Sequence, residues 1–213
     1  MPTTRRYHLA ERPAGKPDDD TFDLREVELG NPGPGQVLVD IQYLSVDPYM
    51  RGRMRAGESY AEPWAVGQPL EGGAVAEVVE EHGTQFEPGD TVVGNLVWAD
   101  QHVANAAELQ SVNVGDLPAS TALGVLGMPG RTAYFGTREV LEPRAGDTVV
   151  VSAAAGAVGS VVGQLAKKQG ANVIGFAGSD EKCDVVEEEF GFDACINYKA
   201  TDDYVAALAE AAP

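Results

Sequence analysis

Three glycines follow a β-branched apolar run in the second half of the chain, and their spacing suits a phosphate-binding turn. The run 148–151 ends in small residues, and Gly156, Gly159 and Gly163 recur as a helical pattern begins. Glycine lets the backbone approach a pyrophosphate closely, and the N–H groups and dipole of a helix N-terminus attract its charge. The order strand, glycine turn, helix predicts a dinucleotide-binding site. The alternative is a tight turn in another kind of α/β protein.

The turn departs from the usual G-x-G-x-x-G fingerprint at one position. Ala154 occupies the place of the first glycine, ahead of Gly156 and Gly159. Alanine is compatible with the turn only if its backbone angles are ordinary for an L-residue. The sequence therefore predicts ordinary backbone angles at Ala154.

Residues after the next expected strand bear on the choice between NAD and NADP. NAD-binding proteins usually place Asp or Glu at the end of this strand, where it holds the ribose 2′-hydroxyl. Here that position is Gly178, so no carboxylate repels a 2′-phosphate, and Ser179 and Lys182 supply a hydrogen-bond donor and a positive charge. The pattern favours NADPH. In the alternative interpretation Ser179 is a helix N-cap and Lys182 a solvated surface lysine.

The elements expected to position these residues alternate regularly from residue 148 onward. Such alternation predicts right-handed βαβ units and a parallel sheet. Three strands form one mononucleotide-binding half of a dinucleotide domain, which has about six. We therefore interpret the chain as part of a longer protein. After the first strand we expect strands over 172–177 and 194–197, and helices over 158–169, 180–190 and 202–211.

The first half of the chain has a sequence pattern typical of a β domain. Short strand-like runs punctuated by glycine and proline predict a compact, barrel-like arrangement. Residues 101–120 are expected to form short strands and loops. We place the domain boundary between residues 123 and 124, and expect helices over 119–126 and 132–141 with Pro129 and Gly130 between them. The strand-like runs are 6–11, 21–29, 36–46, 74–80 and 91–94.

Composition excludes several classes of partner. Acidic residues outnumber basic ones 33 to 15, for a net charge of -18, so neither nucleic acid nor anionic lipid is expected as a main partner. Scarce lysine beside excess carboxylate indicates a salt-adapted cytoplasm, with a merely acidic mesophilic protein as the alternative. The N-terminus lacks the apolar core of a secretory signal, and no apolar run approaches the ~20 residues of a membrane span. We expect a cytoplasmic protein.

Metal-ligating side chains are few and scattered. Cys183 and Cys195 cannot form a four-ligand zinc site alone, and the histidines have no ligand-like spacing. We expect no metal and two ordinary buried thiols.

Several motifs together resemble the zinc-independent medium-chain reductases, in particular the leukotriene B4 12-hydroxydehydrogenase / prostaglandin reductase family with its alkenal double-bond reductases. The resemblance covers essentially the whole chain. It implies an α/β protein with a GroES-like β-barrel domain over 1–123, followed by a partial Rossmann domain over 124–213. The motifs are Val-Asp-Pro-Tyr-Met-Arg at 46–51, Gly-Met-Pro-Gly-Arg-Thr-Ala-Tyr-Phe-Gly at 127–136, the glycine turn at 153–163, Gly-Ser-Asp-Glu-Lys at 178–182 and Asn-Tyr-Lys at 197–199.

The resemblance also implies roles for individual residues. The turn residues would line the pyrophosphate, a lysine, a tyrosine and a serine would hold the 2′-phosphate, and a methionine and a threonine would approach the nicotinamide. Tyr49 would border the substrate pocket, unless it is simply a packed aromatic residue, and plain core packing is the alternative for Met128. The expected cofactor-binding residues are Met128, Thr132, Gly156, Ala157, Val158, Gly159, Ser179, Lys182 and Tyr198.

The expected reaction is NADPH-dependent reduction of the C=C bond of a small enone or enal. In this family hydride goes to the β-carbon and the resulting enolate is protonated at the α-carbon. The family's tyrosine donor, like its dimer contact, lies beyond residue 213, so no catalytic residue is assigned and a homodimer is expected only of a full-length chain. The alternatives are an NADPH:quinone reductase of the same superfamily and a truncated, non-catalytic product.

Overall fold

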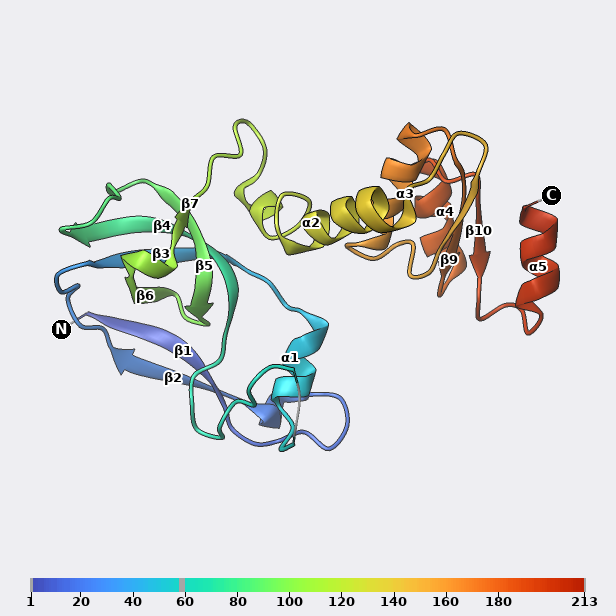
Figure 1. Ribbon diagram of the computed structural model, residues 1–213. Coiled ribbons are helices and arrows are strands. Elements are labelled where there is room, and N and C mark those ends of the chain that lie inside the picture. The colour runs from blue at the N-terminus through green and yellow to red at the C-terminus, as the bar shows by residue number, and fades with distance from the viewer. Residues whose placement is uncertain (1, 58–59, 213) are drawn as a thin grey trace. The chain divides into compact units, whose positions relative to one another are not determined.

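The computed structural model describes residues 2–57 and 60–212. The chain divides into two compact units, Met1–Leu123 and Gly124–Pro213 (Figure 1). Each unit has its own buried core.

The first unit is a β domain made from a five-stranded antiparallel sheet and a two-stranded ribbon. The sheet order is β6-β3-β4-β5-β7, and the ribbon is β1-β2. Backbone hydrogen bonds join the ribbon to the segments flanking the sheet, because Tyr7 donates to the Trp98 carbonyl and Leu70 donates to the Tyr7 carbonyl. The elements are β1 (Thr3–Leu9), β2 (Phe22–Glu28), β3 (Gln36–Leu44), α1 (Pro48–Arg53), β4 (Glu71–His82), β5 (Thr91–Val97), β6 (Gln101–Asn105) and β7 (Gln110–Ser111).

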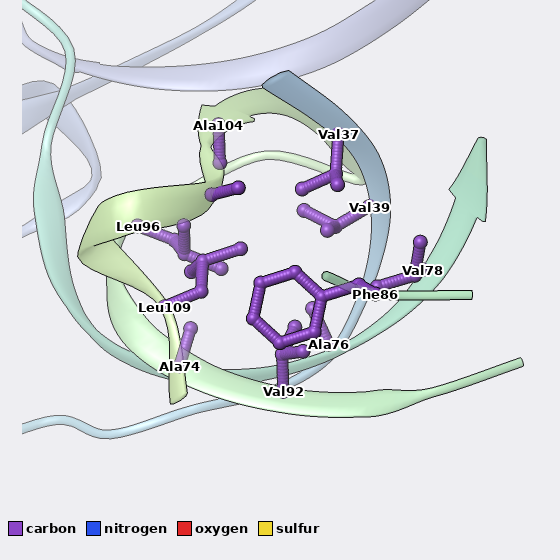
Figure 2. Close-up of a cluster of buried hydrophobic side chains, with 11 residues drawn as sticks. Val37, Val39, Ala74, Ala76, Val78, Phe86, Val92, Leu96, Ala104 and Leu109 are labelled. Carbon is purple, nitrogen blue, oxygen red and sulfur yellow. The ribbon is translucent and has the colours of Figure 1, made fainter. Parts of the chain in front are cut away.

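Period-two alternation builds the core of this unit. Val37 and Val39 of β3, and Ala74, Ala76 and Val78 of β4, lie two positions apart and join the same cluster, because successive side chains of a strand point to opposite faces. Phe86, from the connection between β4 and β5, fills the space among these small side chains (Figure 2). The main cluster comprises Val37, Val39, Ala74, Ala76, Val78, Phe86, Val92, Leu96, Ala104, Ala106 and Leu109.

The strands differ from the sequence prediction mainly in length. β4 covers Glu71–His82 rather than 74–80, and β1 covers Thr3–Leu9 rather than 6–11. The pairing partners account for the difference. β4 is paired along its length with β3 and β5, while β1 pairs with β2 only from Thr3 to Leu9.

The second unit confirms the predicted alternation of strands and helices. Its three strands form a parallel sheet in the order β10-β9-β8, which leaves β8 at one edge among the described residues. Apolar side chains from the strands and from the helices α3 and α4 form its core. The elements are α2 (Met128–Phe135), β8 (Thr148–Val151), α3 (Gly159–Lys168), β9 (Asn172–Ala177), α4 (Asp180–Glu188), β10 (Ala194–Asn197) and α5 (Tyr204–Ala211).

The prediction that Pro129 and Gly130 separate two helices was wrong. Both residues lie in the first turn of α2, where the missing N–H of proline costs no helical hydrogen bond. A Cβ atom at Gly130 would overlap the carbonyl of Val125, so the preceding turn packs against the helix at a point where only glycine fits.

The expected helix over 119–126 was also wrong. Only Ala119–Ala122 is helical there, as a short 3₁₀ turn. Beyond α2 the helix continues as π-helical turns over Gly136–Leu141, and it ends at Glu142, whose φ of 47° is left-handed. Local sequence favoured helix through this stretch, but the packing of residues 123–127 against α2 decided where it begins.

Asp193, just before β10, fastens α3 to β9. The Lys167 ammonium donates to its Oδ1 at 2.7 Å and the Val173 N–H donates to its Oδ2 at 2.6 Å. Burial raises the pKa of the Asp193 carboxyl, but the bonds from Lys167 and Val173 outweigh burial and hold that pKa below its usual range.

Replacing Asp193 with asparagine should destabilise the second unit at neutral pH by about 1 kcal/mol, a modest amount because both charged side chains are partly exposed. A pKa lowered by folding adds stability above the unfolded value of about 3.9, and this stability is lost as pH falls through the native pKa. The gap between wild type and Asp193→Asn should therefore be largest at pH 7 and shrink below about pH 4. Urea unfolding of both proteins, followed by circular dichroism at several pH values, measures this difference in unfolding free energy. A gap that stays constant across this range would contradict the assignment.

Candidate dinucleotide-binding site

The turn after β8 is held in a conformation unusual for its residues. Ala153 has a φ of 50°, in the left-handed region that costs an L-residue about 1–2 kcal/mol. The Gly156 N–H donates to the Ala153 carbonyl at 2.8 Å. Ala154 is not among the described residues with positive φ, and its N–H donates to the Phe176 carbonyl at 3.0 Å. The prediction of ordinary angles at Ala154 is confirmed, and the left-handed residue is its neighbour Ala153.

Helix α3 begins against this turn. A Cβ atom at Gly159 would overlap the Ala153 carbonyl oxygen, and one at Gly156 would lie 3.0 Å from the same atom. Glycine at both positions therefore lets the helix start close to the turn, which is the packing reason for these residue types.

The start of α3 leaves backbone donors available. The Ser160 N–H donates to the Gly156 carbonyl at 3.0 Å, but the hydrogen bonds among the described residues include none from the N–H groups of Ala157, Val158 and Gly159. Unbonded N–H groups at the positive end of a helix attract an anion. Ala157, Val158 and Gly159, which the sequence analysis assigned to a pyrophosphate, are thus consecutive residues whose N–H groups are available to an anion.

The end of β9 is covered by a phenol ring. Tyr198, directly after β10, donates its N–H to the Ala177 carbonyl at 3.1 Å, and its own carbonyl accepts from the Tyr204 hydroxyl at 3.2 Å. A Cβ atom at Gly178 would lie 2.7 Å from the Tyr198 hydroxyl oxygen. A side chain at the strand-end position, which carries a carboxylate in NAD-binding proteins, would therefore have to displace the Tyr198 ring.

Ser179 is the N-cap of α4. Its Oγ accepts from the Lys182 N–H at 3.4 Å, as the alternative interpretation of this residue anticipated. Its own N–H and the Ser179 hydroxyl, as hydrogen-bond donors, lower the pKa of the Glu181 carboxyl below its usual range. The Lys182 side chain is exposed and forms none of the ion pairs found among the described residues.

Met128 and Thr132 lie one turn apart on α2. The Thr132 hydroxyl donates to Met128 Sδ at 3.5 Å, and the Met128 side chain is 53% exposed. Met128 does not belong to any of the buried clusters found, so the plain core-packing alternative is not what the structure shows for it.

Tyr49 belongs to the first unit. It follows Pro48 at the start of α1 and packs against a buried cluster around Met50 and Trp64. Burial, with a smaller contribution from Asp47, raises the pKa of Tyr49 above its usual value, and Arg53 opposes the shift. Tyr49 is thus a partly buried aromatic residue whose hydroxyl stays protonated at neutral pH.

The two cysteines are free thiols on α4 and β10. Cys183 is buried as expected, whereas Cys195 is only partly buried. Burial together with a hydrogen bond to Cys183 raises the pKa of the Cys195 thiol. Within residues 2–57 and 60–212, no three His, Cys, Asp or Glu side chains are grouped so as to hold a metal ion. In the same ranges, no helix combines the length and the apolar character needed to cross a membrane.

Sequence reasoning missed two features of this site. The left-handed angle of Ala153 has no signal in the residue type. The Asp180 carboxylate accepts from the Asn197 side chain at 2.7 Å, across a separation of 17 residues. Asn197 belongs to the Asn-Tyr-Lys motif at 197–199, which the sequence analysis identified, but the motif does not reveal that Asp180 is its hydrogen-bond partner.

Comparison with known proteins places these features in context. Residues 5–112 match the family model described as the N-terminal domain of oxidoreductase, and residues 157–213 match that of zinc-binding dehydrogenase. The NADPH-dependent curcumin reductase of Escherichia coli (strain K12) is 46% identical over 211 residues, which cover 98% of this chain and 60% of that protein. The NADP(+)-dependent 2-alkenal reductase of Nicotiana tabacum is 45% identical over 199 residues, covering 91% of this chain and 58% of that protein.

A solved structure supports the same relationship. The crystal structure of CurA from Vibrio vulnificus in complex with NADPH superimposes with a TM-score of 0.88 at 43% identity, over 97% of this chain and 61% of that one. The present chain therefore spans about three fifths of the length of the relatives it matches.

Proposed function

This chain belongs to the medium-chain dehydrogenase/reductase family, in the group of the prostaglandin, alkenal and curcumin reductases, and from that membership we propose that it uses NADPH to reduce the C=C bond of α,β-unsaturated ketones and aldehydes. One observation carries the cofactor part of this proposal. The position that selects NAD by a carboxylate is Gly178, at the end of β9, where the Tyr198 hydroxyl lies over the glycine, while Lys182 lies exposed in the first turn of α4.

The described residues fit such a cofactor. The free N–H groups of Ala157, Val158 and Gly159 would bind the pyrophosphate at the start of α3. Lys182 and Tyr198, with Ser179 beside them, would hold the 2′-phosphate. On the resemblance of the 127–136 motif, Met128 and Thr132 would border the nicotinamide.

The residues of this chain would bind and orient, while a bound NADPH supplies the hydride. Lys182 adds a local positive charge in a chain whose net charge is -18, where a phosphate is otherwise repelled. Tyr49 would border the substrate pocket.

Truncating Lys182, which is proposed to bind the 2′-phosphate, tests the cofactor assignment. Lys182→Ala should weaken NADPH binding by about 1.5–3 kcal/mol, because a charge-assisted hydrogen bond is lost, and should leave NADH binding nearly unchanged. Calorimetric titration of the 213-residue chain in high salt measures both affinities. Lys168→Ala, which removes an exposed lysine at the end of α3, is the matched control. Equal losses for NADPH and NADH in Lys182→Ala would rule out the 2′-phosphate role.

Turnover tests the reaction class. Oxidation of NADPH is followed by absorbance with an enone, an enal and a quinone as separate acceptors. Reduction of the enone or enal, with the saturated carbonyl compound as product, supports the proposal. Oxidation with the quinone alone would instead assign the chain to quinone reduction, and failure of the chain to bind NADPH would overturn the cofactor assignment.

A further inference from the structure

The first turn of α4 contains two acidic residues beside the proposed 2′-phosphate site. Asp180 and Glu181 follow the N-cap Ser179, where carboxylates stabilise a helix through its dipole. A phosphate monoester carries a charge of about -1.5 to -2 at pH 7, so the same carboxylates would repel it. Helix stability and phosphate binding therefore make opposite demands on this turn.

Asn197 bonds one of these carboxylates. Its Nδ2 donates to Asp180 Oδ1 at 2.7 Å, and its own Oδ1 accepts from the Lys199 N–H at 3.0 Å. The second bond sets the orientation of the amide, because only the NH₂ group then faces the carboxylate.

The backbone places this asparagine at the same edge of the sheet as the cofactor loop. Asn197 is the last residue of β10 and is in register with Ala177, the last residue of β9. Gly178 and Ser179 follow directly. The Asn197 side chain therefore reaches the start of α4 from the neighbouring strand, next to the Tyr198 ring that covers Gly178.

We propose that Asn197 is a positioning residue for cofactor selectivity: by holding the Asp180 carboxylate, it keeps that charge from turning toward the 2′-phosphate bound by Lys182 and Tyr198. The inference rests on the proposed use of NADPH and adds a residue that the family motif alone does not explain.

Removing the restraint should cost NADPH affinity specifically. In Asn197→Ala the Asp180 carboxylate is free to approach the 2′-phosphate, and like charges a few ångströms apart at a protein surface should weaken NADPH binding by about 5- to 10-fold. NADH has no 2′-phosphate, so its affinity should change less than about twofold. Asp180→Asn removes the charge and should bind NADPH as tightly as the wild type or more tightly.

The double variant separates charge from structure. In Asp180→Asn/Asn197→Ala no carboxylate remains to repel the phosphate, so NADPH affinity should return to within about twofold of the wild type. Calorimetric titration of the four proteins with NADPH and NADH measures these effects, with circular dichroism as the check on folding. The loss in Asn197→Ala should also shrink in molar KCl, where charge repulsion is screened. Asn197→Ser, too short to reach Asp180, replaces the alanine variant if that variant does not fold.

Two outcomes would overturn the inference. One is a loss in Asn197→Ala that is equal for NADPH and NADH. The other is a double variant that binds NADPH as weakly as Asn197→Ala, because the bond would then act only as a structural tie. A wild-type chain without preference for NADPH contradicts the proposed function itself. A selective wild type with unchanged Asn197→Ala contradicts only the role of Asn197.

Discussion

Aspartate in place of Gly178 is expected to weaken NADPH binding by at least about 100-fold while changing NADH affinity by less than about tenfold. Two effects combine. A Cβ atom there would lie 2.7 Å from the Tyr198 hydroxyl, so the ring proposed to hold the 2′-phosphate must move. The new carboxylate would also stand where NAD-binding proteins accept the ribose 2′-hydroxyl, and it would repel a phosphate.

Gly178→Ala is the matched control for this variant. Alanine introduces the same Cβ atom and displaces Tyr198, but adds no charge, so it should lose about tenfold in NADPH affinity and much less than aspartate. Titration of both variants with both cofactors separates the two contributions. If alanine and aspartate lose NADPH affinity to the same extent, charge plays no part in the selectivity of this position. If aspartate lowers NADH affinity as much as NADPH affinity, the proposed location of the ribose is wrong.

The largest expected effect on stability comes from Gly163. This residue lies on the buried face of α3, and a Cβ atom there would overlap three ring atoms of Phe192. Phe192 is 5% exposed and belongs to the core of the second unit, so its ring has little room to move. Gly163→Ala should therefore destabilise this unit by about 2–3 kcal/mol or more, although alanine is the better helix former.

Gly136 offers a matched control within the same unit. It has helical backbone angles, φ −60° and ψ −40°, and an added Cβ atom would meet nothing within 4 Å. Gly136→Ala should stabilise the protein by about 0.4–1 kcal/mol, so the same substitution has opposite signs at the two sites. The double variant Gly163→Ala/Phe192→Leu should recover part of the stability lost in Gly163→Ala, because the smaller side chain makes room.

Circular dichroism and tryptophan fluorescence report the unfolding of different units of the protein. Both tryptophans, Trp64 and Trp98, are in the first unit, whereas the longer helices are in the second. The urea midpoint from the helical signal should fall in Gly163→Ala and rise in Gly136→Ala. A Gly163→Ala protein as stable as the wild type by this signal would show that the core around Phe192 is not tightly packed.

Local pattern accounted for most of the second unit. The β-branched run before the glycines, the recurrence of apolar residues and the small residues between them predicted the parallel strands and their helices within a few positions. The motifs identified the family, which the comparisons confirm. The prediction failed around Pro129 and Gly130, which were assigned to a break between helices. Their residue types are typical of turns, but contact with Val125 makes them the first turn of α2.

The sequence by itself determined the fold class and the place of the glycine turn, because strand and helix periodicity and the need for glycine near a phosphate are properties of neighbouring residues. Only the tertiary structure decided that Ala153 rather than Ala154 takes the left-handed conformation, that the Tyr198 hydroxyl lies over Gly178, and that Asn197 holds Asp180. The last two depend on β9 and β10 lying side by side in register, which brings together residues far apart in the chain. Pairing across a sheet is a property of the whole fold, so no local pattern could reveal it.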